Sequence, residues 1–227
     1  NYDRIDFTPI EKGENFFDFI GLEILPYLSE NYNVGPFSVV VGHDYMANFM
    51  NLFLFSKKIP FDGFINLSPD VPNGFISYIA EKMYELESDL WYSITMGSND
   101  INFIKQKTKK LHSNLSSVDN DKLKLSFNVF ENTNHYTFVN YAIPFSLSEI
   151  FKPFTAIDDE EYEESLSKAS DPTDYLIEKY KKEKKKQKSV VFQPYGSGVD
   201  IINHQVLDRS NRSLTQDHST KLIQEMS

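Results

Sequence analysis

The feature that most constrains the fold of this chain is an alternation of short apolar runs with segments of helical periodicity. The first predicted strand, 37–41, is a continuous apolar run, and further short strands are predicted within 61–70, 90–97 and 123–130. A polar loop follows each run, and apolar residues at helical spacing come next. Continuous apolar runs are typical of strands that are buried on both faces. Repeated strand and helix units therefore predict an α/β fold, a three-layer sandwich with a mainly parallel sheet.

Five segments carry the helical spacing that this fold requires. They are Gly13–Asn31, Tyr45–Ser56, Asn73–Ser88, Asn102–Val118 and Thr137–Phe151. Pro26 predicts a bend in the first of these helices, because proline cannot donate a backbone hydrogen bond. Pro144 interrupts the last helix in the same way at some cost in stability.

The character of the sequence changes near Ile157. The charge runs "DDEEYEES" and "KKEKKKQK" are typical of a solvated helical face or a linker. Between them, Asp171 as N-cap and Pro172 at the first helical position mark the start of a helix. We predict an α/β domain over 1–156, and a charged helical extension with a polar tail over 157–227.

Composition excludes several classes of function. The chain has 33 acidic and 23 basic residues and a formal net charge of −10, which argues against binding to nucleic acid or to an anionic membrane surface. No apolar run approaches the roughly 18–20 residues that span a bilayer. The chain contains no cysteine, which excludes disulfides, thiolate metal sites and a cysteine nucleophile. We expect a soluble globular protein, cytoplasmic or, with an upstream signal, secreted or periplasmic.

Three of the predicted strands end in polar loops that carry acids or histidine. Asp44 follows the first strand, Asp100 follows the third, and His135 follows the fourth. Ligands of open parallel sheets bind beyond the carboxyl ends of the strands. The sequence therefore places an aspartate, a second acid and a histidine at one edge of the sheet, in that order along the chain.

A resemblance to a known family rests on three stretches in this region. "ENFFDFIGLEILPYLSENYNVGPFSVVVGHDYMANF", followed by "FDGFINLSPD" and by "NTNHYTFVNYAIP", resembles the α/β-hydrolase family that contains esterase D and enterochelin esterase. In that family a strand ends in Gly-His-Ser-x-Gly, the nucleophile elbow, the acid follows a later strand, and the histidine precedes the last helix. Its early strands and oxyanion loop have no counterpart here, so we expect N-terminal strands to be missing from the chain.

The resemblance assigns roles to particular residues. It implies Asp44 at the nucleophile position, Asp100 as the acid, His135 as the catalytic histidine and the backbone N–H of Tyr45 as an oxyanion donor. Asp70 is the alternative acid. His43 and Asp70 are also candidates for substrate binding.

The chain departs from this family at the elbow itself. Asp44 stands in place of the serine, and Met46 in place of the second glycine. A carboxylate that attacks an ester must form a reactive anhydride, so ordinary serine-esterase chemistry is not expected. A carboxylate can displace a leaving group from an sp3 carbon instead, as in haloalkane dehalogenases and epoxide hydrolases. The other readings of Asp44 are a general base or electrostatic element, a ligand-binding group and a plain helix N-cap.

For the other two site candidates, a purely structural role is the alternative to a catalytic one. Asp100 could cap the helix that follows it, and His135 could be a loop histidine bonded to backbone. We predict the hydrolysis of an ester-like small substrate through an atypical site of Asp44, Asp100 and His135. The alternative is a catalytically silent homologue that binds a ligand or a protein partner.

No histidine has metal-ligand spacing with another histidine or acid, so neither a metal nor another cofactor is expected. The oligomeric state does not follow from the sequence.

Overall fold

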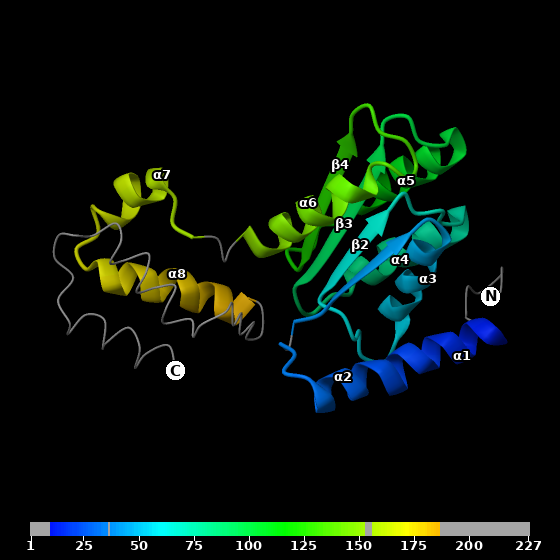
Figure 1. Cartoon of the computed structure of the whole chain (residues 1–227), viewed down its shortest axis with the longest axis horizontal. Coiled ribbons are helices and arrows are strands. Elements are labelled where there is room, and N and C mark those ends of the chain that lie inside the picture. The colour runs from blue at the N-terminus through cyan, green and yellow to red at the C-terminus, as the bar shows by residue number, and fades with distance from the viewer. Residues whose placement is uncertain (1–9, 36, 153–155, 187–227) are drawn as a thin grey trace. The chain divides into compact units, whose positions relative to one another are not determined.

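The computed structural model describes residues 10–35, 37–152 and 156–186 (Figure 1). The chain forms two compact units, Asn1–Ile150 and Phe151–Ser227. The predicted division at 156 and 157 stays a prediction. The predicted polar tail lies outside the described residues, as does the end of the second charge run.

A four-stranded parallel sheet forms the centre of the first unit, with the strands in the order β1-β2-β3-β4. The strands span Val39–His43, Gly63–Leu67, Leu90–Gly97 and Leu123–Phe130. The α/β fold with a parallel sheet, as predicted from the apolar runs, is confirmed. β1 begins and ends two residues later than predicted, because it continues through Gly42 to pair His43 with Leu67.

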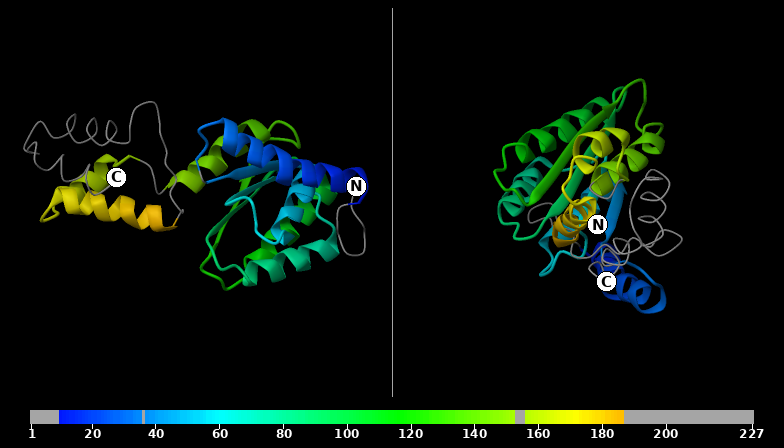
Figure 2. Two further views of the ribbon diagram at one scale, coloured as in Figure 1. Left: turned by 90° about the horizontal axis from the view of Figure 1, so that it is seen from below. Right: turned by 90° about the vertical axis from the view of Figure 1, so that its left-hand side faces the viewer.

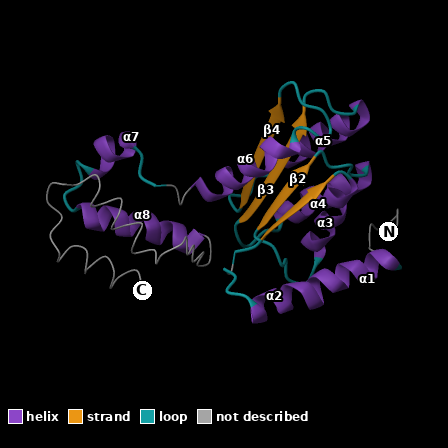
Figure 3. Cartoon of the chain, in the orientation of Figure 1, coloured by secondary structure: helices purple, strands orange, loops and turns teal. Residues whose placement is uncertain are grey.

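Helices flank the sheet in Figures 2 and 3. After β1 come α3 and the 3-10 helix η2, after β2 comes α4, after β3 comes α5, and after β4 comes α6. Their bounds are Tyr45–Met50, Asn51–Phe55, Asn73–Tyr84, Asn102–Leu115 and Val139–Phe151. Each predicted helix is present, although those that follow β1, β2 and β3 are shorter than the sequence pattern suggested.

Successive residues of β3 show which helices cover which face. Ser93 bonds Ser146 of α6 through the two hydroxyl groups, at 2.8 Å. The Tyr92 hydroxyl points to the opposite face, since neighbouring side chains of a strand alternate, and donates to the Asn51 side-chain oxygen of η2 at 2.9 Å. The sheet thus lies between α6 on one face and the α3–η2 segment on the other.

A buried polar network lies beneath α3 within the hydrophobic core. The Asn51 amide donates to the Ala47 carbonyl at 3.0 Å and to the Asn66 side chain at 2.8 Å. Asn66 in turn donates to the Ser93 carbonyl at 3.3 Å. Burial raises the pKa of the Tyr92 hydroxyl, which keeps it a neutral donor. Because each amide is satisfied, the network ties α3 and η2 to β2 and β3.

The N-terminal helical segment packs on the same side as α3. It consists of α1 (Lys12–Asp18), a wider π-helical turn η1 (Phe19–Ile24) and α2 (Leu25–Asn31), with Pro26 in the first turn of α2. Phe17 stacks on Phe53 of η2 with ring centroids 4.1 Å apart. The predicted helix is therefore present over Lys12–Asn31, and the π-helical turn lies directly before the turn that contains Pro26.

The second unit contains α7 (Asp159–Glu161), the π-helical turn η4 (Tyr162–Leu166) and α8 (Pro172–Lys186). The Asp171 carboxylate accepts the Thr173 N–H at 2.8 Å, so the predicted N-cap is confirmed. A small apolar cluster of its own holds this unit together; it comprises Ile157, Leu166, Leu176 and Ile177. Across the part of the chain that the structure describes, none of the helices has the length and apolar character needed to cross a membrane.

Candidate active site

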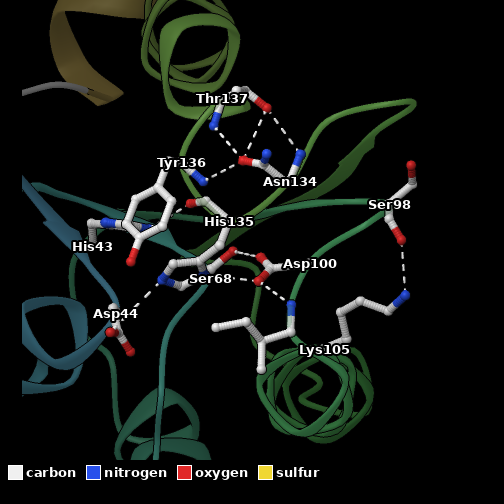
Figure 4. A network of polar contacts seen from close by, with 11 residues as sticks. His43, Asp44, Ser68, Ser98, Asp100, Lys105, Asn134, His135, Tyr136 and Thr137 are labelled. Carbon is white, nitrogen blue, oxygen red and sulfur yellow. Dashed lines mark hydrogen bonds and ion pairs between the residues drawn. The ribbon is translucent and has the colours of Figure 1, made fainter.

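The carboxyl ends of the strands bring the predicted site residues together (Figure 4). Asp44 follows β1 directly, Asp100 lies in the loop between β3 and α5, and His135 lies in the loop between β4 and α6. The His135 imidazole lies between the two carboxylates. Its Nδ1 is 2.8 Å from Oδ1 of Asp100, and its Nε2 is 3.7 Å from Oδ2 of Asp44.

Asp44 occupies a sharp turn between strand and helix. Its φ of 56° and ψ of −123° lie outside the regions that L-residues ordinarily adopt. Gly42 makes the turn possible, because a Cβ at this position would lie 2.5 Å from the Ala47 Cα. Met46 does not crowd the turn: its side chain is exposed, and the small buried residue is Ala47. The backbone thus has the strained strand-to-helix turn that a nucleophile elbow requires.

The helix-cap interpretation of Asp44 is wrong for this structure. The Asp44 side chain accepts no capping hydrogen bond from α3. Within the described part of the chain, its Oδ1 atom is buried and has no hydrogen-bond partner, whereas the side chain as a whole is 29 % exposed. A buried carboxylate oxygen without a donor is costly. The strain and this oxygen together mark position 44 as a candidate functional position.

Asp100 and His135 form a buried acid–histidine pair. The side chains are 0 % and 6 % exposed. A carboxylate only accepts hydrogen bonds, so Nδ1 of His135 carries the proton and donates to Oδ1 of Asp100. In the neutral ring, Nε2 then has its lone pair free on the side of Asp44.

The structural roles considered for Asp100, as a helix cap, and for His135, as a histidine bonded to backbone, also differ from the observed contacts. The helix α5 begins at Asn102 with Ile101 as its N-cap, so Asp100 is not the cap. The His135 ring bonds a carboxylate rather than backbone. Gly97, at the end of β3, allows the loop that carries His135 to approach the β3 backbone, because a Cβ at Gly97 would lie 2.6 Å from the Thr133 carbonyl oxygen.

His43 supports the backbone of the His135 loop. Its Nε2–H donates to the His135 carbonyl at 2.9 Å, and the two rings are 4.4 Å apart. Burial, and next the proximity of His135, lower the pKa of His43, so the ring stays neutral more readily than a free histidine. Its assignment to substrate binding remains a prediction.

Asp70 and Tyr45 complete the set of predicted residues. The Asp70 carboxylate forms an ion pair with Lys107 of α5, and the acid that contacts His135 is Asp100. Tyr45 is the first residue of α3, so its backbone N–H has no acceptor inside the helix. The role of this N–H as an oxyanion donor stays a prediction.

Sequence reasoning missed one member of the network. Ser68 directly follows β2, is completely buried and donates through its hydroxyl to Oδ2 of Asp100 (Figure 4). Nothing local in Leu-Ser-Pro distinguishes Ser68 from an ordinary loop serine. A weak signal was its place at the carboxyl end of a strand.

The arrangement combines two proton acceptors that face each other. When His135 is neutral with its proton on Nδ1, Nε2 and the Asp44 carboxylate are both hydrogen-bond acceptors, and their 3.7 Å separation exceeds a hydrogen bond. A molecule with two O–H groups, such as water, can donate to both. Within residues 10–35, 37–152 and 156–186, no cluster of three or more histidine or acidic side chains is arranged to hold a metal ion.

Comparison with known proteins gives structural matches alone. No protein-family model matches the chain. No curated protein matches it either. Among solved structures, an uncharacterised protein from Capnocytophaga ochracea DSM 7271 is 18 % identical, with a TM-score of 0.71 over 95 % of this chain. An IroE-like serine hydrolase from Shewanella oneidensis is 14 % identical, with a TM-score of 0.72 over 99 % of this chain. The BES protein from Bacillus cereus is 22 % identical, with a TM-score of 0.55 over 66 % of this chain.

The chain is shorter than all three of these proteins. It spans 60 % of the Capnocytophaga protein, 70 % of the Shewanella hydrolase and 59 % of the Bacillus protein. At these identities the likeness concerns the fold. The chain therefore has an α/β fold with a parallel sheet, and this fold is similar to that of an IroE-like serine hydrolase.

Proposed function

We propose that this protein hydrolyses a small ester-like substrate by direct attack of water, with Asp44, His135 and Asp100 as the catalytic residues. The observation that carries the proposal is the pair of acceptors, Nε2 of His135 and Oδ2 of Asp44, 3.7 Å apart beside a strained elbow. Structural similarity to a serine hydrolase supports a hydrolytic reaction, although likeness of fold alone does not assign an activity.

In the proposed reaction, one water donates a hydrogen bond to each of these two acceptors. The water oxygen attacks the ester carbonyl carbon while Nε2 of His135 takes the proton. Asp100 and Asp44 then flank the imidazolium and stabilise its charge. The tetrahedral intermediate expels the alkoxide, which takes the proton back from Nε2. Asp44 is unchanged, so no anhydride forms.

The oxyanion of the intermediate needs donors of its own. The backbone N–H of Tyr45, at the N-terminus of α3, is the donor that we propose from the described residues. His43 is proposed to hold the His135 carbonyl, and hence the loop, in place.

The test uses nitrophenyl esters of short acids with the purified chain and its variants. We expect slow turnover by the wild type and a fall of about 10²–10⁴-fold in kcat/KM for His135→Gln, because the general base is lost. Asp44→Asn should reduce kcat/KM by about 10-fold or more, because its amide can donate to Nε2 and occupy the base. The matched controls are His112→Gln on α5 and Asp121→Asn, an exposed carboxylate, which should retain activity.

Asp44→Ser separates the proposal from its rivals. If the wild type is inactive and Asp44→Ser turns over the ester, the native site is silent and the protein is a binding homologue. If Asp44→Asn matches the wild type, Asp44 has no part in the reaction. A covalent mass adduct on Asp44 after incubation with an epoxide or a haloalkane would replace the water mechanism with attack by the carboxylate on an sp3 carbon.

A further inference from the structure

The Asp100 carboxylate is completely buried, so its oxygens need hydrogen-bond donors from neighbouring residues. Its side chain is 0 % exposed. A buried carboxylate stays ionised only when hydrogen-bond donors replace the lost water. Oδ1 receives the Ile101 N–H at 2.6 Å and the Nδ1–H of His135 at 2.8 Å. Oδ2 needs a donor of its own.

Ser68 supplies that donor from a different strand. Its hydroxyl donates to Oδ2 of Asp100, across 32 residues of sequence. The Ser68 N–H donates to the Thr95 carbonyl at 2.8 Å, which continues the β2–β3 ladder. Its φ of 44° lies in the left-handed region and turns the chain out of the sheet directly after β2. The serine is therefore fixed through its backbone and not only through its side chain.

The contacts also exclude a different role for this serine. Ser68 is 0 % exposed, so a substrate does not reach its hydroxyl. The ring nitrogen of His135 nearest to Asp100 is already bonded to that acid. Ser68 is consequently not a second nucleophile.

We propose that Ser68 is a positioning residue: it fixes the rotation of the Asp100 carboxylate about its Cβ–Cγ bond and thereby keeps His135 in the tautomer that leaves Nε2 free. This inference rests on the proposed function for its effect on turnover, whereas its effect on the His135 ring can be measured without any substrate. With Ser68 in place, each oxygen of Asp100 has its own donors and the carboxylate has one orientation. Without the hydroxyl, Oδ2 is buried and unsatisfied, and the carboxylate turns to share the remaining donors.

The experiment compares Ser68→Ala and Ser68→Gly with the wild type. Both variants remove the hydroxyl, but glycine also relieves the positive φ. In protein labelled with 15N-histidine, the Nδ1–H resonance of His135 is assigned by its absence in His135→Gln. We expect this resonance to broaden and to exchange faster with water in both Ser68 variants. In the ester assay, kcat should fall about tenfold with KM unchanged, the effect of one lost hydrogen bond to a charged group.

Ser146→Ala is the matched control. Ser146 is equally buried and shares a hydroxyl bond with Ser93, on the face of the sheet that α6 covers. Its loss should leave the His135 resonance and kcat unchanged. An unchanged Nδ1–H resonance in both Ser68 variants would overturn the inference even if the enzyme is active. A changed resonance in a protein without esterase turnover would support the inference while the proposed function fails.

Discussion

The two halves of the site are held in place by different means. Asp100 and His135 are buried and linked by hydrogen bonds, with Ser68, Ile101 and His43 as further partners. The elbow at Asp44 depends on a strained backbone turn, and its carboxylate is partly exposed, with one oxygen that has no hydrogen-bond partner among the described residues. The difference teaches that hydrogen bonds stabilise the acid–histidine pair, whereas the elbow holds the Asp44 carboxylate in a strained conformation at a cost in stability.

The largest expected effect concerns the hydrogen-bonded half. Asp100→Asn keeps the shape of the side chain but offers an amide to the ring, which favours the wrong tautomer of His135. We expect kcat to fall by about 10²–10⁴-fold, the range seen when the acid of such a pair is lost. Steady-state kinetics with a nitrophenyl ester measures it.

Asp70→Asn is the control for this prediction. Asp70 is also buried, at 6 % exposure, but its partner is Lys107. The variant should lose some stability and keep most of its kcat. Equal losses of kcat in the two variants would mean that the Asp100–His135 bond has no special role.

A smaller effect is expected at the elbow. There a substitution should increase the stability of the protein, whereas Asp70→Asn should decrease it. Asp44→Gly relieves the positive φ and removes the unbonded carboxylate oxygen, so we expect the free energy of unfolding to rise by about 1 kcal/mol. Urea denaturation measures this change. Glu11→Gly is the matched control, because Glu11 has nearly the same backbone angles, φ 49° and ψ −119°, at the start of α1. A loss of stability in Asp44→Gly would show that the elbow stores no strain.

The smallest effect is a pH dependence that runs through His43. Its pKa is lowered below 6.5, first by burial and next by His135, so the folded state binds fewer protons than the unfolded state in mildly acidic solution. The stability from this residue is complete above pH 6.5 and is lost as the pH falls below it. Urea denaturation between about pH 7.5 and 5.5 should show this loss.

His43→Gln should make that pH dependence shallower. His112→Gln tests the same effect away from the site, since burial also lowers the pKa of His112, and the two changes should add. If the free energy of unfolding depends on pH equally in His43→Gln and in the wild type, the protonation of His43 does not affect stability.

The strands show how far a hydrophobic pattern predicts this fold. β3 and β4 have the predicted bounds: β3 is mostly apolar, β4 alternates apolar and polar residues, and polar residues flank both strands. β1 was predicted to end before Gly42, since neither glycine nor histidine continues an apolar run, yet the ladder extends to His43. The predicted helix after Asp44 changes to a 3-10 helix at Asn51, where the side chain donates a hydrogen bond to Asn66 of β2. Such a contact has no local signature.

The order of site residues was predictable, but the contacts among them were not. Asp44, Asp100 and His135 follow strands whose ends meet in any parallel sheet. Whether Asp44 caps its helix depends on a backbone angle that its neighbours alone do not fix. The Ser68–Asp100 bond depends on the register between β2 and β3 and on a turn at positive φ. Only the folded arrangement brings these atoms together.

The amide network of Asn51 and Asn66 has a consequence for how this site can change over evolution. The network anchors α3 and η2 to the sheet from below, and the side chain of residue 44 takes no part in it. A mutation at that position therefore alters the chemistry of the site while the backbone that presents it stays the same. A single codon change at position 44 can thus replace the group that the turn presents while the scaffold is kept.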